Sequence, residues 1–244
     1  MKAIVTGHSR GLGAAIAEDL LARRIGVVGI SRTRNADLAG RYRDALDEVE
    51  LDLADSRALE DWLRNETFSR VLAGSDPVLL VNNAGVLQPI APLQNQELPA
   101  IARAVAVNVG AALMLASAFA VATGDSRDRR IVHISSGAAR APYAGWSVYC
   151  ATKAALDQHA RAVALDNTPG LRICSVAPGV VDTEMQTEIR ASSLDRFPLR
   201  GRFEEFKRKG ELATPAAAAG RVVDYALRDD FGREPVVDLR PPSR

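Results

Sequence analysis

Tyr149 and Lys153 are the two residues of this sequence whose types and spacing best fit proton chemistry. They stand four positions apart in the segment Ser-Val-Tyr-Cys-Ala-Thr-Lys. Residues at this spacing share one face of a helix, so the lysine brings a positive charge beside the phenol. A phenol titrates at about 10 in water and rarely gives up its proton at neutral pH. We expect the charge of Lys153 to lower the pKa of Tyr149 toward the range of a general acid or base.

A glycine-rich turn follows the first apolar run of the chain. Residues 6–13 read Thr-Gly-His-Ser-Arg-Gly-Leu-Gly and lead into a helical pattern at Ala14. Such a turn lets a pyrophosphate approach the amino terminus of a helix, where free N–H groups and the helix dipole favour an anion. The spacing differs from the commoner Gly-x-Gly-x-x-Gly, and an unliganded strand-to-helix turn is the alternative. Its place between the first strand and the first helix favours a dinucleotide.

Two arginines predict which dinucleotide is preferred. The second apolar run ends at Arg32, about 20 residues past the turn, where a carboxylate would bind the ribose 2′-hydroxyl of NAD. Arg10 lies inside the glycine turn. Two guanidinium groups at one corner suit a 2′-phosphate, which an acidic residue would repel. We therefore expect NADP(H) to be preferred over NAD(H).

The elements that must position these residues follow an alternating pattern. Apolar, β-branched runs predict strands at 3–6, 27–30, 48–51, 78–81, 131–135, 172–177 and 236–239. Amphipathic stretches between them predict helices at 13–23, 56–65, 98–122, 146–167 and 215–227. Such alternation indicates a parallel sheet covered by helices on both faces. Because no repeat or linker interrupts the pattern, residues 1–244 are expected to form one α/β domain.

Residues 184–212 differ from the rest of the chain. The segment is dense in charge and irregular, with phenylalanines and leucines among arginines and glutamates. It lies as an insertion between the sixth predicted strand and the last predicted helix. Long connections in compact domains are usually functional lids or disordered. We expect a lid over the substrate, and a mobile surface insertion is the alternative.

Composition is that of an ordinary soluble globular protein. Of 244 residues, 47% are hydrophobic and the formal net charge is +1, which gives no electrostatic reason to expect nucleic acid or an anionic membrane as partner. The first strand begins at once, which leaves no room for a signal peptide. Two cysteines cannot build a disulfide framework. We expect a cytoplasmic protein, in which the uncharged stretch 104–124 is a buried or subunit-contact helix rather than a membrane span.

The remaining candidate residues carry weaker signals. His8, His133 and His159 show no metal-ligand spacing, so no metal site is expected. Cys150 lies one step around the helix from Tyr149 and is interpreted as a packing residue. Trp146 lies beside the Tyr149 motif, and it lines a substrate pocket or covers the core.

Taken together, the motifs resemble the short-chain dehydrogenase/reductase family over nearly the whole chain. They are Thr6–Gly13, Asp52-Leu53, Asn82-Asn83-Ala84-Gly85, Asn108, Ile134-Ser135-Ser136, Tyr149–Lys153 and Pro178-Gly179. Residues 145–157, 177–186 and 209–212 are most similar to the sepiapterin reductases and the benzil reductase-like carbonyl reductases. The resemblance implies a single-domain Rossmann fold with a doubly wound, seven-stranded parallel sheet.

The resemblance also implies roles for four catalytic residues. Tyr149 would be the general acid or base, and Lys153 would hold the ribose of the nicotinamide. Ser136, thirteen residues before the tyrosine, would bind the substrate oxygen, whereas its neighbour Ser135 lacks the family spacing. Asn108 would hold a water molecule through its backbone carbonyl.

The cofactor and substrate residues are assigned in the same way. Asp52 would bond the adenine amine, and residues 82–85 would pass over the adenosine ribose. The full expected cofactor set is Gly7, Ser9, Arg10, Gly11, Leu12, Gly13, Arg32, Asp52, Leu53, Asn82, Asn83, Ala84, Gly85, Tyr149, Lys153, Pro178, Gly179, Val181 and Thr183. The substrate candidates are Leu87, Trp146, Met185 and Asp238, the last of these near the place of the carboxylate that anchors the pterin in sepiapterin reductases.

These assignments predict an NADPH-dependent reductase of a small-molecule ketone or diketone. An NADP-dependent secondary-alcohol dehydrogenase is the alternative within the same chemistry, because one site catalyses both directions. A non-catalytic dinucleotide-sensing regulator is the alternative outside it, although such proteins usually lack one of the four catalytic residues. The apolar helix at 104–123 and the Tyr149 helix are expected to pair across a two-fold axis, giving a homodimer or a homotetramer.

Overall fold

The computed structural model describes residues 1–240, and within them the backbone forms one twisted parallel sheet. Its seven strands run in the order β3-β2-β1-β4-β5-β6-β7, and every neighbouring pair is parallel. The strands are β1 (Lys2–Thr6), β2 (Gly26–Ser31), β3 (Leu46–Glu50), β4 (Val78–Asn82), β5 (Arg129–Ile134), β6 (Leu171–Ala177) and β7 (Val236–Asp238). The predicted single α/β domain with a doubly wound sheet is confirmed for the described residues.

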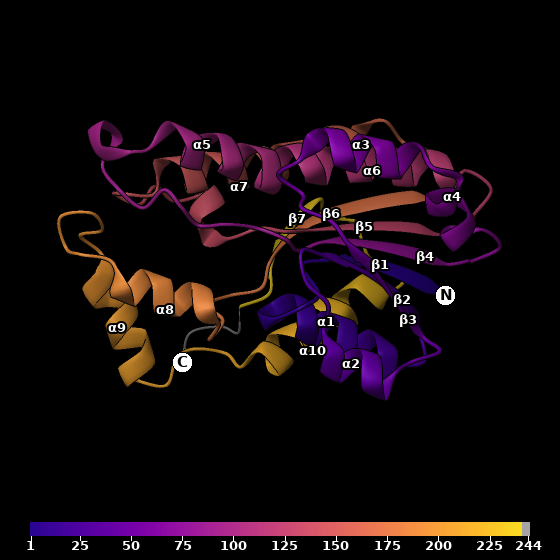
Figure 1. Cartoon of the computed structure of the whole chain (residues 1–244), viewed down its shortest axis with the longest axis horizontal. Helices are drawn as coiled ribbons and strands as arrows, with labels where there is room; N and C mark the ends of the chain where they lie inside the picture. Colours follow the sequence, from indigo (N-terminus) through magenta and orange to yellow (C-terminus); the bar gives the residue numbers. More distant parts are fainter. Residues whose placement is uncertain (241–244) are drawn as a thin grey trace.

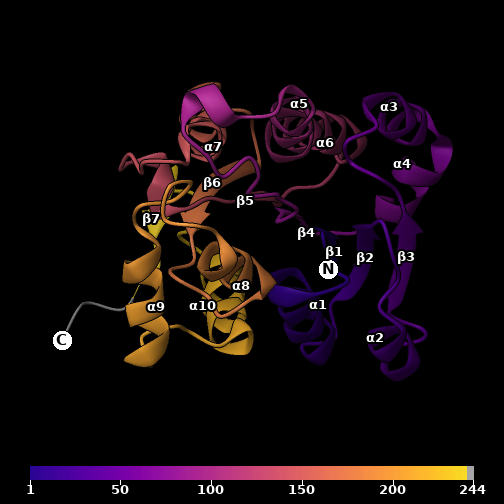
Figure 2. The ribbon, with the colours of Figure 1, turned by 60° about the vertical axis from the view of Figure 1, so that its left-hand side comes forward.

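Helices cover both faces of this sheet (Figures 1 and 2). One face carries α1 (Gly11–Ala22), α2 (Ala36–Arg41) and α10 (Pro215–Leu227). The other carries α3 (Ser56–Arg64), α4 (Glu66–Leu72), α5 (Leu98–Val105), α6 (Ala111–Ala122) and α7 (Ser147–Leu165). Two further helices, α8 (Glu184–Ala191) and α9 (Arg200–Arg208), lie beyond the carboxyl ends of the strands.

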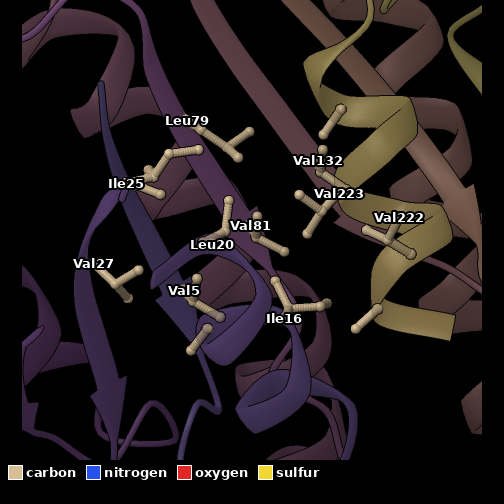
Figure 3. Packing of buried hydrophobic residues seen from close by; sticks show 14 of the residues in the cluster. Val5, Ile16, Leu20, Ile25, Val27, Leu79, Val81, Val132, Val222 and Val223 are labelled. Carbon is tan, nitrogen blue, oxygen red and sulfur yellow. The ribbon is translucent and has the colours of Figure 1, made fainter. Parts of the chain in front are cut away.

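The core forms on both sides of the sheet because successive strand residues point to opposite faces. In β1, Val5 packs with Leu20 and Val223 between the sheet and the helices α1 and α10 (Figure 3). Its neighbour Ile4 faces the other way and packs with Phe119 beneath α6. Both clusters are closed to solvent, so the strands hold their carboxyl ends in fixed positions.

The predicted helix 98–122 is interrupted. A π-helical turn, η2 (Ala106–Gly110), separates α5 from α6, and Asn108 lies at its centre. The side chain of Asn108 bonds both main-chain groups of Val86, at 2.8 Å each, and the hydroxyl of Thr152 at 3.1 Å. Single π-turns inside α-helices occur mostly at functional sites. By length and hydropathy alone, Leu98–Ala122 could cross a membrane, and 44% of its 18-residue window is buried inside the protein.

Residues 184–212 are not the irregular insertion that their composition predicts. They form α8 and α9, and the buried residues Ile189, Phe197 and Phe203 turn inward. The sequence analysis also missed α2 and α4, helices of six and seven residues. Such short helices contain too few turns to show a clear period, and side-chain caps from Asn35 and Asn65 mark where they start.

Candidate active site

A cavity of about 970 Å³ opens at the carboxyl ends of the strands. It extends across the point where the strand order reverses, between β1 and β4, which is where ligands of doubly wound sheets bind. Residues from the glycine turn, from the ends of β2, β4, β5 and β6, from α7 and from α8 and α9 line it. Sequence-distant motifs are thereby brought into one site.

The glycine turn has the form expected of an anion cradle. The φ angles of Gly7 and Gly11 are +69° and +58°, a region that side chains disfavour. At Gly13 a Cβ atom would lie 2.1 Å from the carbonyl oxygen of Gly7, so only glycine fits. No side chain caps α1 at Arg10, which leaves the first N–H groups of the helix available to a ligand. All residues expected from this turn line the cavity: Gly7, Ser9, Arg10, Gly11, Leu12 and Gly13.

Thr6 joins the glycine turn to the turn after β4. Its hydroxyl oxygen accepts the N–H groups of Asn83 and Ala84, both at 2.9 Å. Asn83, Ala84 and Gly85 line the cavity as predicted. Asn82 does not appear in its lining, because its side chain is buried and donates to the carbonyl of Ala112 at 3.1 Å. A contact between Asn82 and the cofactor stays a prediction.

At the end of the cavity near β2 and β3, an ion pair holds the carboxylate of Asp52. Arg103 of α5 donates to both of its oxygens, at 3.1 to 3.3 Å, and the N–H of Ala54 donates at 3.0 Å. Burial raises the pKa of Asp52, but these hydrogen bonds outweigh burial and hold the pKa below its ordinary value. Leu53 and Arg32 line the same end, and Arg32 makes no ion pair within residues 1–240. Sequence reasoning missed Arg103, whose only signal is a single charge within an apolar helix.

Tyr149 and Lys153 lie on one face of α7, both more than nine-tenths buried. The Lys153 Nζ atom is 5.7 Å from the centre of the phenol ring and donates to the carbonyl oxygen of Ile134 at 2.8 Å. Burial raises the pKa of Tyr149 to about 12, and a hydrogen bond from Ser136 lowers it only in part. Burial also lowers the pKa of Lys153 to about 8, against the charge of Asp157. The prediction that the pKa of Tyr149 is lowered is therefore wrong, because burial raises this pKa by more than its neighbours lower it.

The two serines after β5 have different surroundings. The Ser136 hydroxyl oxygen accepts the N–H of Ala138 at 3.2 Å, at the start of the short helix η3 (Gly137–Ala139). Ser135 instead donates to the buried carboxylate of Asp157 at 2.6 Å. Of the two serines, Ser136 is the one that lowers the pKa of Tyr149.

Asn108 is buried behind the cavity wall rather than on it, and its neighbour Val107 is the lining residue. Its amide group fixes the turn that follows β4 through Val86. A water held by its backbone carbonyl stays a prediction.

The turn after β6 and three of the four substrate candidates also line the cavity. From that turn come Pro178, Gly179, Val181 and Thr183, and from the substrate set Leu87, Trp146 and Met185. Asp238 is not among the lining residues within residues 1–240, and its carboxylate pairs with Arg240 at 2.7 Å and with Arg140 at 3.5 Å. A role of Asp238 as a substrate anchor stays a prediction, and Arg240 lines the cavity.

An aromatic cluster joins the catalytic helix to α9 and the loop before it. Trp146 stacks on Phe197, with centroids 4.5 Å apart and 12° between the rings, and meets Tyr149 edge-on at 5.5 Å. Phe203 packs against both Trp146 and Phe197. From the sequence, Trp146 could either line the substrate pocket or cover the core. In the structure Trp146 does both. Tyr143, Phe203 and Phe206 also line the cavity.

The histidines make structural contacts. His8 bonds Glu48 at 2.7 Å, and His133 bonds His159 at 3.0 Å. Burial lowers the pKa of His133 to about 3, so its ring is neutral. Within residues 1–240, no three His, Cys, Asp or Glu side chains gather as metal ligands would. Cys150 packs beside the aromatic cluster, and burial raises the pKa of its thiol.

Known proteins share this fold and these motifs. The family profile described as short chain dehydrogenase matches residues 1–194. The chain belongs to the short-chain dehydrogenase/reductase family. Benzil reductase ((S)-benzoin forming) of Bacillus cereus is 34% identical over 97% of this chain and 98% of its own. Sepiapterin reductase of Meriones unguiculatus is 32% identical over 97% of this chain and 95% of its own.

Solved structures of the short-chain dehydrogenase/reductase family agree with this assignment. A member from Burkholderia vietnamiensis is 48% identical, with a TM-score of 0.72 over 99% of this chain and 98% of its own. The enzyme KRED1-Pglu is 29% identical, with a TM-score of 0.86 over 97% of this chain and 99% of its own. The predicted likeness to sepiapterin and benzil reductases is confirmed. As a short-chain dehydrogenase/reductase, the protein is an oxidoreductase that uses NAD(P)(H) and a small-molecule substrate.

Proposed function

We propose that this protein is an NADPH-dependent carbonyl reductase that reduces a ketone or diketone, with Tyr149 as the general acid. The observation that carries the proposal is that Ser136 and Tyr149 line one cavity, between the glycine turn and the aromatic cluster, where Ser136 lowers the pKa of the phenol. Two hydroxyls side by side can bind one carbonyl oxygen, and one of them can protonate it.

The residues of the chain fit each requirement of this chemistry. NADPH, when bound, supplies the hydride. Ser136 would hold the substrate oxygen, and Tyr149 would give its phenolic proton to that oxygen as the alkoxide forms. A phenol with a pKa of about 12 keeps its proton at neutral pH, and it can give that proton to the more basic alkoxide. Lys153 would bind the ribose hydroxyls and stabilise the phenolate that remains.

The arrangement of arginines supports NADP(H) over NAD(H). Arg32 lines the cavity without an ion-pair partner within residues 1–240, and Arg10 lies at the uncapped start of α1. Glu48 and Glu50 at the end of β3 are both engaged, by His8 and Arg34, so neither faces the ribose unopposed. Guanidinium groups bind phosphate with paired, charge-assisted hydrogen bonds. We propose that Arg32 and Arg10 hold the 2′-phosphate.

The wall of the substrate end supports an aromatic or otherwise flat carbonyl compound. Tyr143, Trp146, Phe203 and Phe206 line this end, together with Leu87 and Met185. Ring faces at this density favour a substrate with rings of its own. The likeness to a protein named benzil reductase makes an aromatic diketone our first choice and a pterin-like ketone the second. We further propose a cytoplasmic homo-oligomer that acts in the direction of reduction.

A screen of NADPH consumption tests the proposal. Purified protein would be assayed with α-diketones, quinones, sepiapterin-like pterins and 3-ketoacyl thioesters, each with NADPH and with NADH, and the reverse reaction with the matching alcohols. We expect the highest kcat/KM for an aromatic α-diketone with NADPH. Turnover of alcohols but of no ketone would favour the dehydrogenase, and binding of NADPH without any turnover would favour the regulator.

A further inference from the structure

Arg10 and Glu184 form an ion pair between the glycine turn and the first residue of α8. The two residues are 174 positions apart in the sequence, and both line the cavity. Their side chains remain 66% and 72% exposed, so packing holds neither of them in place. An exposed ion pair of this kind contributes little stability, and an anionic ligand can therefore exchange with the carboxylate.

The two arginines proposed for the 2′-phosphate thus differ in one respect. Arg32 has no ion-pair partner within residues 1–240, so it can meet a phosphate directly. Arg10 is already engaged by Glu184, and a phosphate must first replace that carboxylate. A phosphate monoester carries a charge of about −1.5 to −2 at neutral pH and offers three acceptor oxygens, against one charge on a carboxylate.

We propose that Glu184 is a specificity-determining residue for the cofactor, which acts as an internal competitor for Arg10. The proposal rests on the NADP(H) preference stated above. The 2′-phosphate of NADP(H) takes the guanidinium of Arg10, and Glu184 returns to solvent. NAD(H) carries a hydroxyl at this position and leaves the ion pair intact.

The exchange also changes how α8 is held. Thr183, the residue before α8, lies against the glycine turn, because a Cβ atom at Gly11 would be 3.6 Å from its Cγ2 atom. The Arg10–Glu184 pair adds a second link between that turn and the helix. NADP(H) removes this second link and NAD(H) keeps it, so the two cofactors leave the lid differently tethered.

The affinities of NADP⁺ and NAD⁺ for matched variants test the proposal by titration calorimetry. Glu184→Gln removes the charge of the competitor and should tighten NADP⁺ binding about two- to fivefold, with NAD⁺ binding unchanged. Glu188→Gln is the control, because Glu188 lies on the same helix and the same cavity but bonds Gln88 rather than Arg10. It should leave the ratio of the two affinities as in wild type. In an Arg10→Ala background, Glu184→Gln should have no effect.

Two results would overturn the proposal. If Glu184→Gln strengthened the binding of NADP⁺ and NAD⁺ equally, Glu184 would act on the pyrophosphate that the two cofactors share. An unchanged or weaker affinity for NADP⁺ would mean that no competition exists. The Arg32→Ala variant distinguishes a failure of the Glu184 proposal from a failure of the proposed function, because Glu184 pairs with Arg10 and not with Arg32. If wild type binds the two cofactors equally and Arg32→Ala changes neither affinity, the NADP(H) preference itself is wrong.

Discussion

The ammonium group of Lys153 lies 5.7 Å from the centre of the Tyr149 ring and gives a hydrogen bond to the carbonyl oxygen of Ile134. The lysine is thus fixed by the end of β5, and the phenol packs against a fixed charge. Burial lowers the pKa of Lys153 to about 8 and raises the pKa of Tyr149 to about 12, so the lysine loses its proton before the tyrosine does. The protein alone therefore keeps the phenol as an acid, and the lysine is the group that titrates near neutral pH.

The first prediction concerns the pH dependence of reduction. As pH rises through about 8, Lys153 loses its proton, while Tyr149 keeps its own to about 12. The kcat/KM for NADPH, which reports groups of the free enzyme, should therefore fall above about pH 8. Lys153→Arg, which stays charged, should be slower but should lack this fall. An alkaline limb near pH 10 in wild type would contradict the assignment.

The second prediction separates proton transfer from cofactor binding. Tyr149→Phe removes the proton donor and should lower kcat by about 10²–10⁴-fold, with the Kd of NADPH within about twofold of wild type. Lys153→Met should weaken NADPH binding as well, since it deletes the ribose contact. Stopped-flow kinetics and fluorescence titration measure the two quantities. A Tyr149→Phe variant that keeps more than about a tenth of the wild-type rate would remove the general-acid role.

The third prediction uses the two neighbouring serines as a matched pair. Ser136→Ala should lower kcat by about a hundredfold with little change in Tm, because Ser136 lines the cavity with Tyr149 and lowers the pKa of its phenol. Ser135→Ala removes one of the bonds to the buried Asp157, which leaves an acceptor less satisfied and should cost about 1–3 kcal/mol of stability. Its kcat per folded molecule should stay near wild type. The reverse pattern would assign the catalytic hydroxyl to Ser135.

The fourth prediction concerns the lid at 184–212. Amide hydrogen exchange of α8 and α9 should slow when NADP⁺ and a substrate analogue are both bound, since closure excludes water from the site. The peptide that covers α2 (Ala36–Arg41) lies on the opposite side of the cofactor turn and serves as the internal reference. Unchanged exchange in the ternary complex would show that the segment is a static wall. Substrate selection would then depend on Leu87, Tyr143 and Trp146.

The fifth prediction concerns assembly. Val105, Val121 and Leu165, on the helices α5, α6 and α7, are 48%, 81% and 79% exposed. Exposed apolar side chains on neighbouring helices indicate a subunit contact. Light scattering should show a dimer or a tetramer at micromolar concentration, and Val121→Glu with Leu165→Glu should dissociate it. Leu194→Glu, which changes an exposed leucine within residues 184–212, should not. A monomeric wild type would contradict the prediction.

The features predicted from the sequence depend on residues that are close together in the chain. The features that were missed depend on residues that are far apart in it. The strands and the glycine turn are local patterns, and each predicted strand matches the structure to within two residues. The π-turn at Asn108 depends on Val86, and the carboxylate of Asp52 depends on Arg103, 51 positions away. No local sequence pattern predicts such pairs, because only the order of the strands in the sheet brings the two residues together. Asp238 combines both cases, because its partner Arg240 is two positions away whereas its partner Arg140 is distant in the sequence.

The pKa of Tyr149 shows a second kind of limit. Helical spacing correctly places Lys153 on the same face of α7, but spacing says nothing about burial. Burial of the phenol outweighs every neighbouring charge in the protein. The direction of the shift followed from the depth of the site, which depends on the cluster that Trp146 and Phe197 build over it.

The reversal of strand order between β1 and β4 also separates the residues of the cofactor end of the cavity from those of the substrate end. Most residues proposed to hold the adenosine half come before position 86, whereas Ser136, Tyr149, Lys153 and the aromatic residues of the cavity come after position 134. Recombination between family members at the β4 turn would therefore carry cofactor choice and substrate choice separately. Within residues 1–240, two ion pairs cross such a junction at the cavity, Asp52 with Arg103 and Arg10 with Glu184. A chimera that keeps both pairs matched inherits each trait from a different parent.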